Sequence, residues 1–157
     1  MTKYRKETKK QGEKMTSEKL FLRYAFPCVE GRVMLGKINP LDYEKLKLFL
    51  QENSDPEQEF LSHCFEDADG QLSAFAKKHG LEKWNLNTVT EFWRHHHVGY
   101  HDGCEVNLVT VVSIKNNFVE VCLDEKNLTV FNPYNLSLQI GDKVYLHRWT
   151  IIEKVED

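Results

Sequence analysis

The spacing of apolar residues changes once along the chain, and this change limits the folds the chain can adopt. From about residue 16 to residue 98, apolar residues recur three and four positions apart, the period of a helix with one buried face. After Gly103 they alternate with polar residues at period two, which is typical of strands. We therefore expect an α+β protein in which an N-terminal helical bundle precedes a small sheet.

Proline and small polar residues mark the ends of the expected helices. Ser17 is expected to cap a short first helix, which Pro27 interrupts. Asn39-Pro40 and Asp55-Pro56 are both cap residues followed by a proline at the first helical position, so each is expected to open a helix. A further helix ends at Gly80, which serves as its C-cap.

The last expected helix begins near Asn87 and runs into three consecutive histidines. In α-helical register, His96 and His97 extend its buried face, whereas His95 points away. A neutral His96 packed against the sheet is favoured over His96 as a metal ligand. The residues on this face are Val89, Phe92, Trp93, His96 and His97.

Turn residues divide the period-two region into four to five short strands. The first contains an alternating set, and further strands follow around Val119, Leu128, Val144 and Ile151. So small a sheet hides its edges best by closing, which predicts a small antiparallel barrel. The alternating set of the first strand is Val106, Leu108, Thr110, Val112 and Ile114.

Charge divides the chain further. Residues 1–14 carry six Lys or Arg and two Glu, whereas the 157-residue chain as a whole has a net charge of −3. We expect a basic disordered tail over 1–15, a helical domain over 16–98 and a barrel domain over 99–157. No apolar run approaches the ~20 residues of a membrane span, and no signal peptide is recognisable. A cytoplasmic protein with reduced cysteines and no membrane partner is therefore expected.

The densest group of potential metal ligands lies at the expected domain junction. His97, His101 and Cys104 offer imidazole and thiolate donors, which suit iron or zinc, and Asp102 adds a carboxylate. In the alternative interpretation, histidines at a helix end pack or interact with the helix dipole and bind no metal. Cys64, in contrast, shares a helical face with apolar residues and is expected in the core.

The end of the chain resembles a known family. The run Val144-Tyr145-Leu146-His147, preceded by Ile140-Gly141-Asp142 and followed by Ile152-Glu153-Lys154, is similar to the last strands of hydrogenase maturation chaperones of the HypC/HupF type. Val111-Val112 lies seven and eight residues after Cys104, the register at which paired valines follow the cysteine of that family. The resemblance covers roughly residues 103–157.

The resemblance implies an OB-like barrel and a chaperone that is not an enzyme. It implies that the thiolate of Cys104 holds an iron centre with diatomic ligands, and that His147 matches the histidine of the family's terminal strand. Its partners would be a maturation scaffold and the large subunit of a nickel–iron hydrogenase. The alternative function is a metal- or ligand-binding module with a His/Cys site at the domain junction.

Signals for catalysis and for nucleic-acid binding are weak. Walker A, GxGxxG, GxSxG and HExxH motifs are all missing from the sequence. Cys104 with His147 or His101 could form an activated nucleophile, but no orienting residue or oxyanion loop can be identified. Residues 104–157 hold five basic and eight acidic residues, the wrong sign for a groove that follows phosphates. The sequence therefore predicts neither an enzyme nor a nucleic-acid partner.

Overall fold

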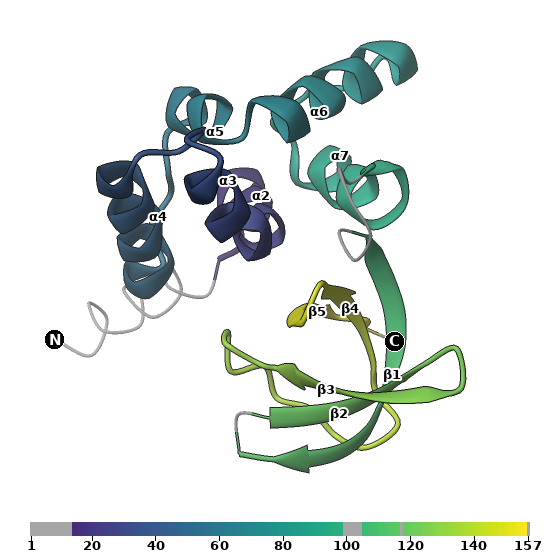
Figure 1. Cartoon of the computed structure of the whole chain (residues 1–157). Coiled ribbons are helices and arrows are strands. Elements are labelled where there is room, and N and C mark those ends of the chain that lie inside the picture. Colours follow the sequence, from purple (N-terminus) through teal and green to yellow (C-terminus); the bar gives the residue numbers. More distant parts are fainter. Residues whose placement is uncertain (1–13, 99–104, 117, 157) are drawn as a thin grey trace, which may run out of the picture. The chain divides into compact units, whose positions relative to one another are not determined.

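The computed structural model describes residues 14–98, 105–116 and 118–156 and shows a mixed helix-and-strand protein, with the helices before the strands (Figure 1). The chain divides into two compact units, Met1–Phe92 and Trp93–Asp157. Residues 1–13 of the expected basic tail lie outside the described residues. In the described ranges, no helix combines the length and the apolar character that crossing a membrane requires.

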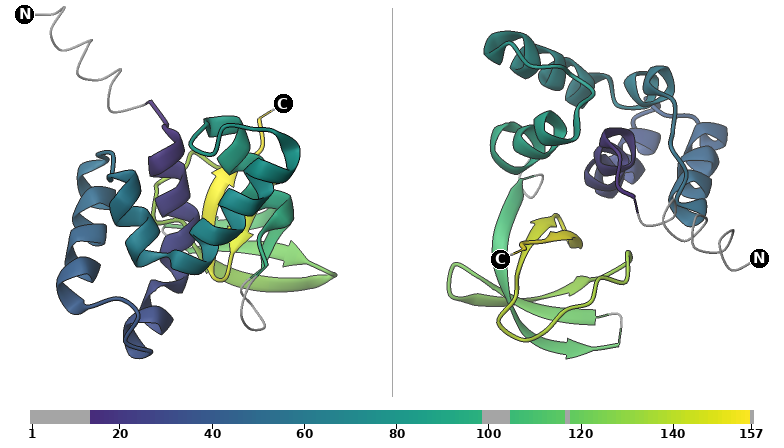
Figure 2. Two further views of the ribbon diagram at one scale, coloured as in Figure 1. Left: turned by 90° about the horizontal axis from the view of Figure 1, so that it is seen from above. Right: turned by 180° about the vertical axis from the view of Figure 1, so that it is seen from behind.

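The helical unit is built around its first described helix, α2. This helix lies between α4 and α7 and also contacts α5 (Figure 2). Its side chains Leu20, Phe21 and Tyr24 are all buried, as their helical spacing predicts. The helices are α2 (Ser17–Ala25), α3 (Val29–Met34), α4 (Pro40–Glu52), α5 (Gln58–Cys64), α6 (Glu66–His79) and α7 (Leu86–Glu91), with a 3₁₀ turn (Phe26–Cys28) after α2.

Two expected helix caps differ from those in the structure. The hydroxyl of Thr16, not of Ser17, accepts the hydrogen bond from the backbone N–H of Lys19 at 3.2 Å. Asp55 does not cap the following helix, which starts only at Gln58, because its carboxylate accepts a hydrogen bond from the Thr16 hydroxyl. The Asp55 carboxylate, which the sequence predicts as the cap of its own helix, instead binds Thr16, the residue that caps α2.

The cap at Asn39 is confirmed and yields a stability prediction. Asn39 Oδ1 accepts a hydrogen bond from the Asp42 N–H at 2.8 Å, and Asn39 Nδ2 donates to Asp42 Oδ2 at 3.1 Å. We expect Asn39→Ala to lower the free energy of unfolding by about 1 kcal/mol, measured by urea denaturation. Asn39→Ser retains an acceptor and should recover most of the loss; equal losses for the two variants would contradict the capping role.

A π-helical turn, η2 (Phe92–His96), continues α7, and of the two histidines expected on the buried face only His97 is partly buried. Next to this wider turn, the rings of Trp93 and His97 are in contact, tilted by 46° with centroids 4.4 Å apart. His96 is exposed, and the expectation that it extends the buried face is wrong; His95 is also exposed, as expected. From Trp93 onward this segment groups with the strands, so the units divide before the histidines rather than after residue 98.

Five strands close into a barrel in the order β1-β2-β3-β5-β4 (Figure 1). The expected antiparallel pairing holds for every neighbouring pair except β3 and β5, which are parallel. The exception is required by geometry, because strand directions cannot alternate around a ring with an odd number of members. The strands are β1 (Val106–Lys115), β2 (Phe118–Leu123), β3 (Lys126–Phe131), β4 (Lys143–His147) and β5 (Thr150–Lys154).

The barrel interior is filled mainly by β-branched residues. In β1 the inward side chains are Val109 and Val111, so the alternating set expected from Val106 is not the interior set. In the middle of β1 both faces carry apolar residues, Leu108 and Val112 on one and Val109 and Val111 on the other. A register shift between Val111 and Ser113 also breaks the period, so alternation could not identify the inward face. The interior residues are Val109, Val111, Val119, Val121, Val130, Val144, Leu146 and Ile151.

Candidate functional site

Two of the candidate site residues meet against a buried tryptophan in the barrel unit. His147 is fully buried at the end of β4, and its ring centroid lies 5.4 Å from that of His97. The indole of Trp93, 1% exposed, lies 4.4 Å from the His97 ring and 5.9 Å from the His147 ring. The fold therefore brings together His97, which follows the π-helical turn, and His147 on β4, 50 positions apart in the sequence.

Arg94 fixes the histidine-bearing segment to the strands. Its guanidinium lies 4.3 Å from the centre of the Tyr145 ring on β4. It also reaches Glu153 on β5, with both Nε and Nη2 3.2 Å from Glu153 Oε1. Because Tyr145 precedes His147 by two residues on the same strand, these contacts hold the segment beside the strand that bears His147.

The other two candidate residues, His101 and Cys104, lie outside the described residues. In the sequence Cys104 precedes Val106 by two positions, and Val106 is the backbone partner of His147 in the β1–β4 pairing. Among the described residues, no group of three His, Cys, Asp or Glu side chains is suited to hold a metal ion. The described part of the site is therefore a histidine pair.

The spacing of this pair can be compared with that of histidines bound to one metal. Zinc–nitrogen bonds are ~2.0–2.1 Å long, so two imidazoles on one tetrahedral ion have ring centroids about 5 Å apart. The observed separation of His97 and His147 is 5.4 Å. The two imidazoles supply nitrogen donors, so a thiolate from elsewhere would be needed for a mixed nitrogen and sulfur ligand set around such an ion.

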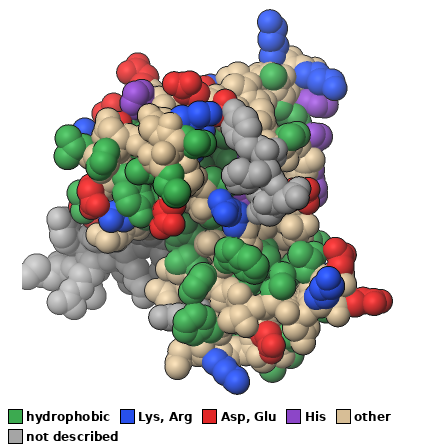
Figure 3. All heavy atoms as spheres, viewed as in Figure 1, with side chains coloured by type: hydrophobic (Ala, Val, Ile, Leu, Met, Phe, Trp, Pro, Cys, Tyr) green, Lys and Arg blue, Asp and Glu red, His purple; other side chains and the backbone are tan. Residues whose placement is uncertain are grey.

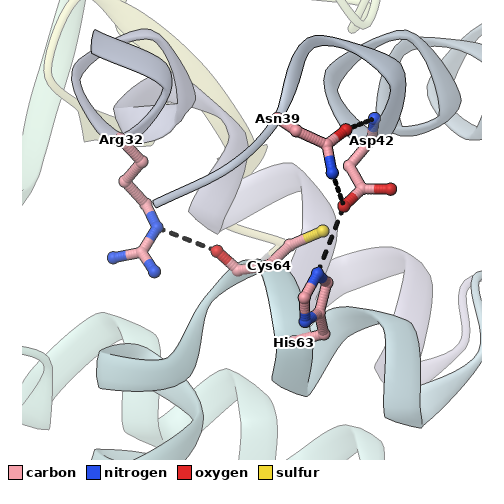
Figure 4. Close-up of polar contacts among 5 residues, drawn as sticks. All are labelled: Arg32, Asn39, Asp42, His63 and Cys64. Atoms are coloured by element: carbon pink, nitrogen blue, oxygen red, sulfur yellow. Dashed lines mark hydrogen bonds and ion pairs between the residues drawn. The ribbon is translucent and has the colours of Figure 1, made fainter. Parts of the chain in front are cut away.

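A second polar cluster lies in the helical unit and has a structural role (Figure 4). Asp42 Oδ2 lies 3.2 Å from His63 Nε2, while Arg32 Nε donates to the backbone carbonyl of Cys64 at 2.8 Å. Arg32 also forms an ion pair with Asp67 at 2.9 Å. The cluster joins α3, α4, α5 and α6 through side chains that cross from one helix to the next.

The thiol in this cluster is unsuited to nucleophilic chemistry. Cys64 is fully buried, and burial, together with the negative charge of Asp42, raises the pKa of its thiol to about 11. Arg32 and Lys45 oppose this shift and are outweighed. Because a thiolate is the reactive form, a thiol that stays protonated at neutral pH is inert. The prediction that Cys64 belongs to the core is confirmed.

Sequence reasoning missed a group of exposed aromatic residues on the barrel. Phe118 and Phe131 are 52% and 50% exposed, and Trp149 is 53% exposed. Figure 3 shows hydrophobic side chains gathered on the surface that the strands form. The alternation of side chains along each strand could have identified these residues. Phe118 precedes the inward Val119 and Phe131 follows the inward Val130, so both phenylalanines must point outward.

Comparison of the sequence with models of known protein families, and with curated protein sequences, gave no match.

Proposed function

We propose that the protein is a non-enzymatic accessory protein for the assembly of a metallocentre, of the nickel–iron hydrogenase type. In this proposal the barrel is of the OB type and binds a partner protein, either the maturation scaffold or the hydrogenase large subunit. The thiolate of Cys104 holds the iron that is handed on. His147 takes part with Cys104 in binding the partner and its iron, and His97 packs against His147.

The strand order supports the OB assignment. Five strands form one small closed barrel, and β5 reaches it by crossing from β4 to lie beside β3. A five-stranded Greek-key barrel is the arrangement of OB folds. A shared fold does not establish a shared function, so the functional proposal depends on the residues of the site.

One observation carries the proposal: the buried His147 pairs with Val106, two residues after Cys104 in the sequence, and contacts His97. Of the two positions that the family resemblance selects, His147 therefore pairs with the residue that follows Cys104 by two positions in the sequence. One histidine of the junction, His97, also contacts the histidine of the terminal strand. Iron accepts both imidazole and thiolate ligands, so the residue types agree with the proposed cargo.

The direct test is co-purification of the full chain with a hydrogenase maturation scaffold under anaerobic conditions. We expect wild-type protein to retain the scaffold and iron, and Cys104→Ala to lose both, because the thiolate is the proposed iron ligand. Iron is measured by elemental analysis and the scaffold by size-exclusion chromatography. Cys122→Ala is the matched control, since Cys122 is a half-buried cysteine on β2 of the same unit.

Three results have distinct meanings. Loss of iron and scaffold in Cys104→Ala alone supports the proposal. Unchanged iron content and scaffold capture in Cys104→Ala would overturn it. Stoichiometric zinc that is retained without the scaffold, and lost in His97→Ala but not in His96→Ala, would favour a metal-binding module instead. The contact between His97 and His147 is the observation that favours this second candidate function, metal binding.

A further inference from the structure

The most exposed large apolar side chains in the described part of the helical unit lie on α4 and just before it. We call this group the α4 surface. Only residues 35–39 separate α3 from α4, and every residue from 34 to 41 is exposed except Ile38, so the surface continues from one helix to the next. Its members are Met34, Leu35, Leu41 and Leu48, which are 88%, 74%, 76% and 50% exposed.

The two leucines on α4 belong to its outward face. The helix packs against α2 and α3 and lies at an edge of the helical unit (Figures 1 and 2). Leu46 is fully buried on its inward face. Leu41 and Leu48 are seven residues, or two helical turns, apart and lie one above the other on the opposite face. An apolar stripe on the outward face of a helix serves no packing purpose within the helical unit.

The area of the α4 surface matches the apolar part of a dimer interface. Its four residues expose about 500 Å² together, within the range of about 300–600 Å² for the largest apolar patch of a monomer, which is often functional. A standard interface buries about 800 Å² on each partner, and about 65% of a homodimer interface is apolar, so its apolar part is also about 500 Å². A second protein chain is therefore an occupant of fitting size.

Two opposite charges flank the leucines of the α4 surface. Glu44 and Lys45 lie between Leu41 and Leu48 along α4, one on each side of the line that joins the leucines. Both charged residues are exposed, and the side chain of Glu44 remains 63% exposed although its carboxylate pairs with Lys47 at 2.9 Å. An anionic lipid surface would favour cations on both flanks, so the mixed charges favour a protein with the same mixture.

This pattern is complementary to itself in one orientation. When two α4 helices lie side by side around a twofold axis parallel to both, Glu44 of one copy faces Lys45 of the other on both flanks, as e and g positions do in parallel coiled coils. In an antiparallel pair, Glu44 would face Glu44 and Lys45 would face Lys45, which is unfavourable. The parallel orientation also brings Met34 and Leu35 of both copies to the same end of the interface.

We propose that the α4 surface joins two copies of this chain in a symmetric dimer in which the α4 helices are parallel. The apolar residues form the centre of the interface, and the pairs of Glu44 with Lys45 form its rim. The proposal uses only residues of the helical unit. Its success or failure is therefore separate from that of the proposed function, and Cys104→Ala should dimerise as wild type does.

The test is sedimentation equilibrium of the full chain over about 1–100 µM, because standard-size interfaces have dissociation constants of about 1 µM or lower. We expect a wild-type species of twice the 18.5 kDa of one chain. Leu41→Asp and Leu48→Asp should each weaken the dimer at least about 30-fold, because symmetry places two carboxylates in an apolar interface. Ile140→Asp is the matched control, since Ile140 is 72% exposed but belongs to the barrel unit. Far-ultraviolet circular dichroism confirms that each variant is folded.

A charge exchange tests the orientation of the two helices. In the parallel dimer, Glu44→Lys and Lys45→Glu each place like charges face to face, so each should weaken the dimer at least about threefold. The double variant Glu44→Lys/Lys45→Glu restores opposite charges and should recover most of the wild-type affinity. Single variants that dimerise as well as wild type, or a double variant weaker than both, would contradict the parallel arrangement.

Three other results would overturn the proposal. The first is a wild-type chain that remains a monomer at about 100 µM, above the dissociation constants of standard-size interfaces. The second is a dimer that Leu41→Asp and Leu48→Asp leave unchanged, which would assign the contact to another surface. The third is a monomer that binds vesicles of phosphatidylcholine and phosphatidylserine through Leu41 and Leu48, which would assign the α4 surface to a lipid surface instead.

Discussion

Trp93→Ala is expected to lower the free energy of unfolding of the barrel unit by about 3–5 kcal/mol. Trp93 is 1% exposed and packs against both His97 and His147. Removing the indole deletes buried apolar surface and leaves a cavity that a closed barrel cannot fill by collapse. Urea denaturation followed by far-ultraviolet circular dichroism measures the loss.

Trp149→Ala is the matched substitution, since it removes the same side chain from an exposed position. We expect it to change the free energy of unfolding by no more than about 0.5 kcal/mol. A similar, large loss for both variants would show that Trp149 is buried in solution. A small loss for Trp93→Ala would contradict the packing described around the histidine pair.

Alkaline pH is expected to destabilise the helical unit through Cys64. Its pKa is raised to about 11 in the folded protein from an ordinary value of 9.0. Below pH 9 the thiol is protonated in both folded and unfolded chains, and stability is unaffected. Above pH 9 the thiol loses its proton in the unfolded chain but keeps it in the folded protein until about pH 11. The free energy of unfolding therefore falls as pH rises from 9 through 11. Two pKa units correspond to a total loss of about 3 kcal/mol.

The measurement is the free energy of unfolding of wild type and Cys64→Ala at several pH values, with reductant present. Cys64→Ala also loses packing at every pH, so the informative quantity is the difference between the two proteins as pH increases. That difference should shrink from pH 9 upward. A constant difference across the same pH range would show that burial does not hold the thiol protonated.

Much of the fold could be predicted from the sequence because local signals agreed with burial. Asn39-Pro40 opens α4, and Gly80, with φ of 65°, ends α6 in the left-handed conformation that favours glycine. The positions of the strands follow from turn residues. What could not be predicted was competition between distant groups, as when the Asp55 carboxylate contacts Thr16 and leaves α5 without a side-chain cap.

The sequence predicted which residue types form the candidate site, but not which of these residues lie next to one another. Periodicity assumed an α-helix up to His97, whereas the π-helical turn exposes His96 and turns His97 toward Trp93. No local signal in the sequence encodes that one extra residue per turn, because it is stabilised by tertiary contacts such as those of Arg94 with Tyr145 and Glu153. The meeting of His97 and His147 depends on strand pairing, which periodicity does not determine.

An odd number of strands leaves the barrel with one weak seam. β3 and β5 are joined by a single backbone pair, Phe131 with Thr150, whereas every other neighbouring pair of strands shares several. This seam is therefore where the barrel opens at the lowest free-energy cost, and its amides exchange with solvent before those of β1 and β2. The Phe131 N–H also donates a hydrogen bond to the Trp149 carbonyl at 2.8 Å, so the closure of the cylinder depends on very few backbone contacts at this one place.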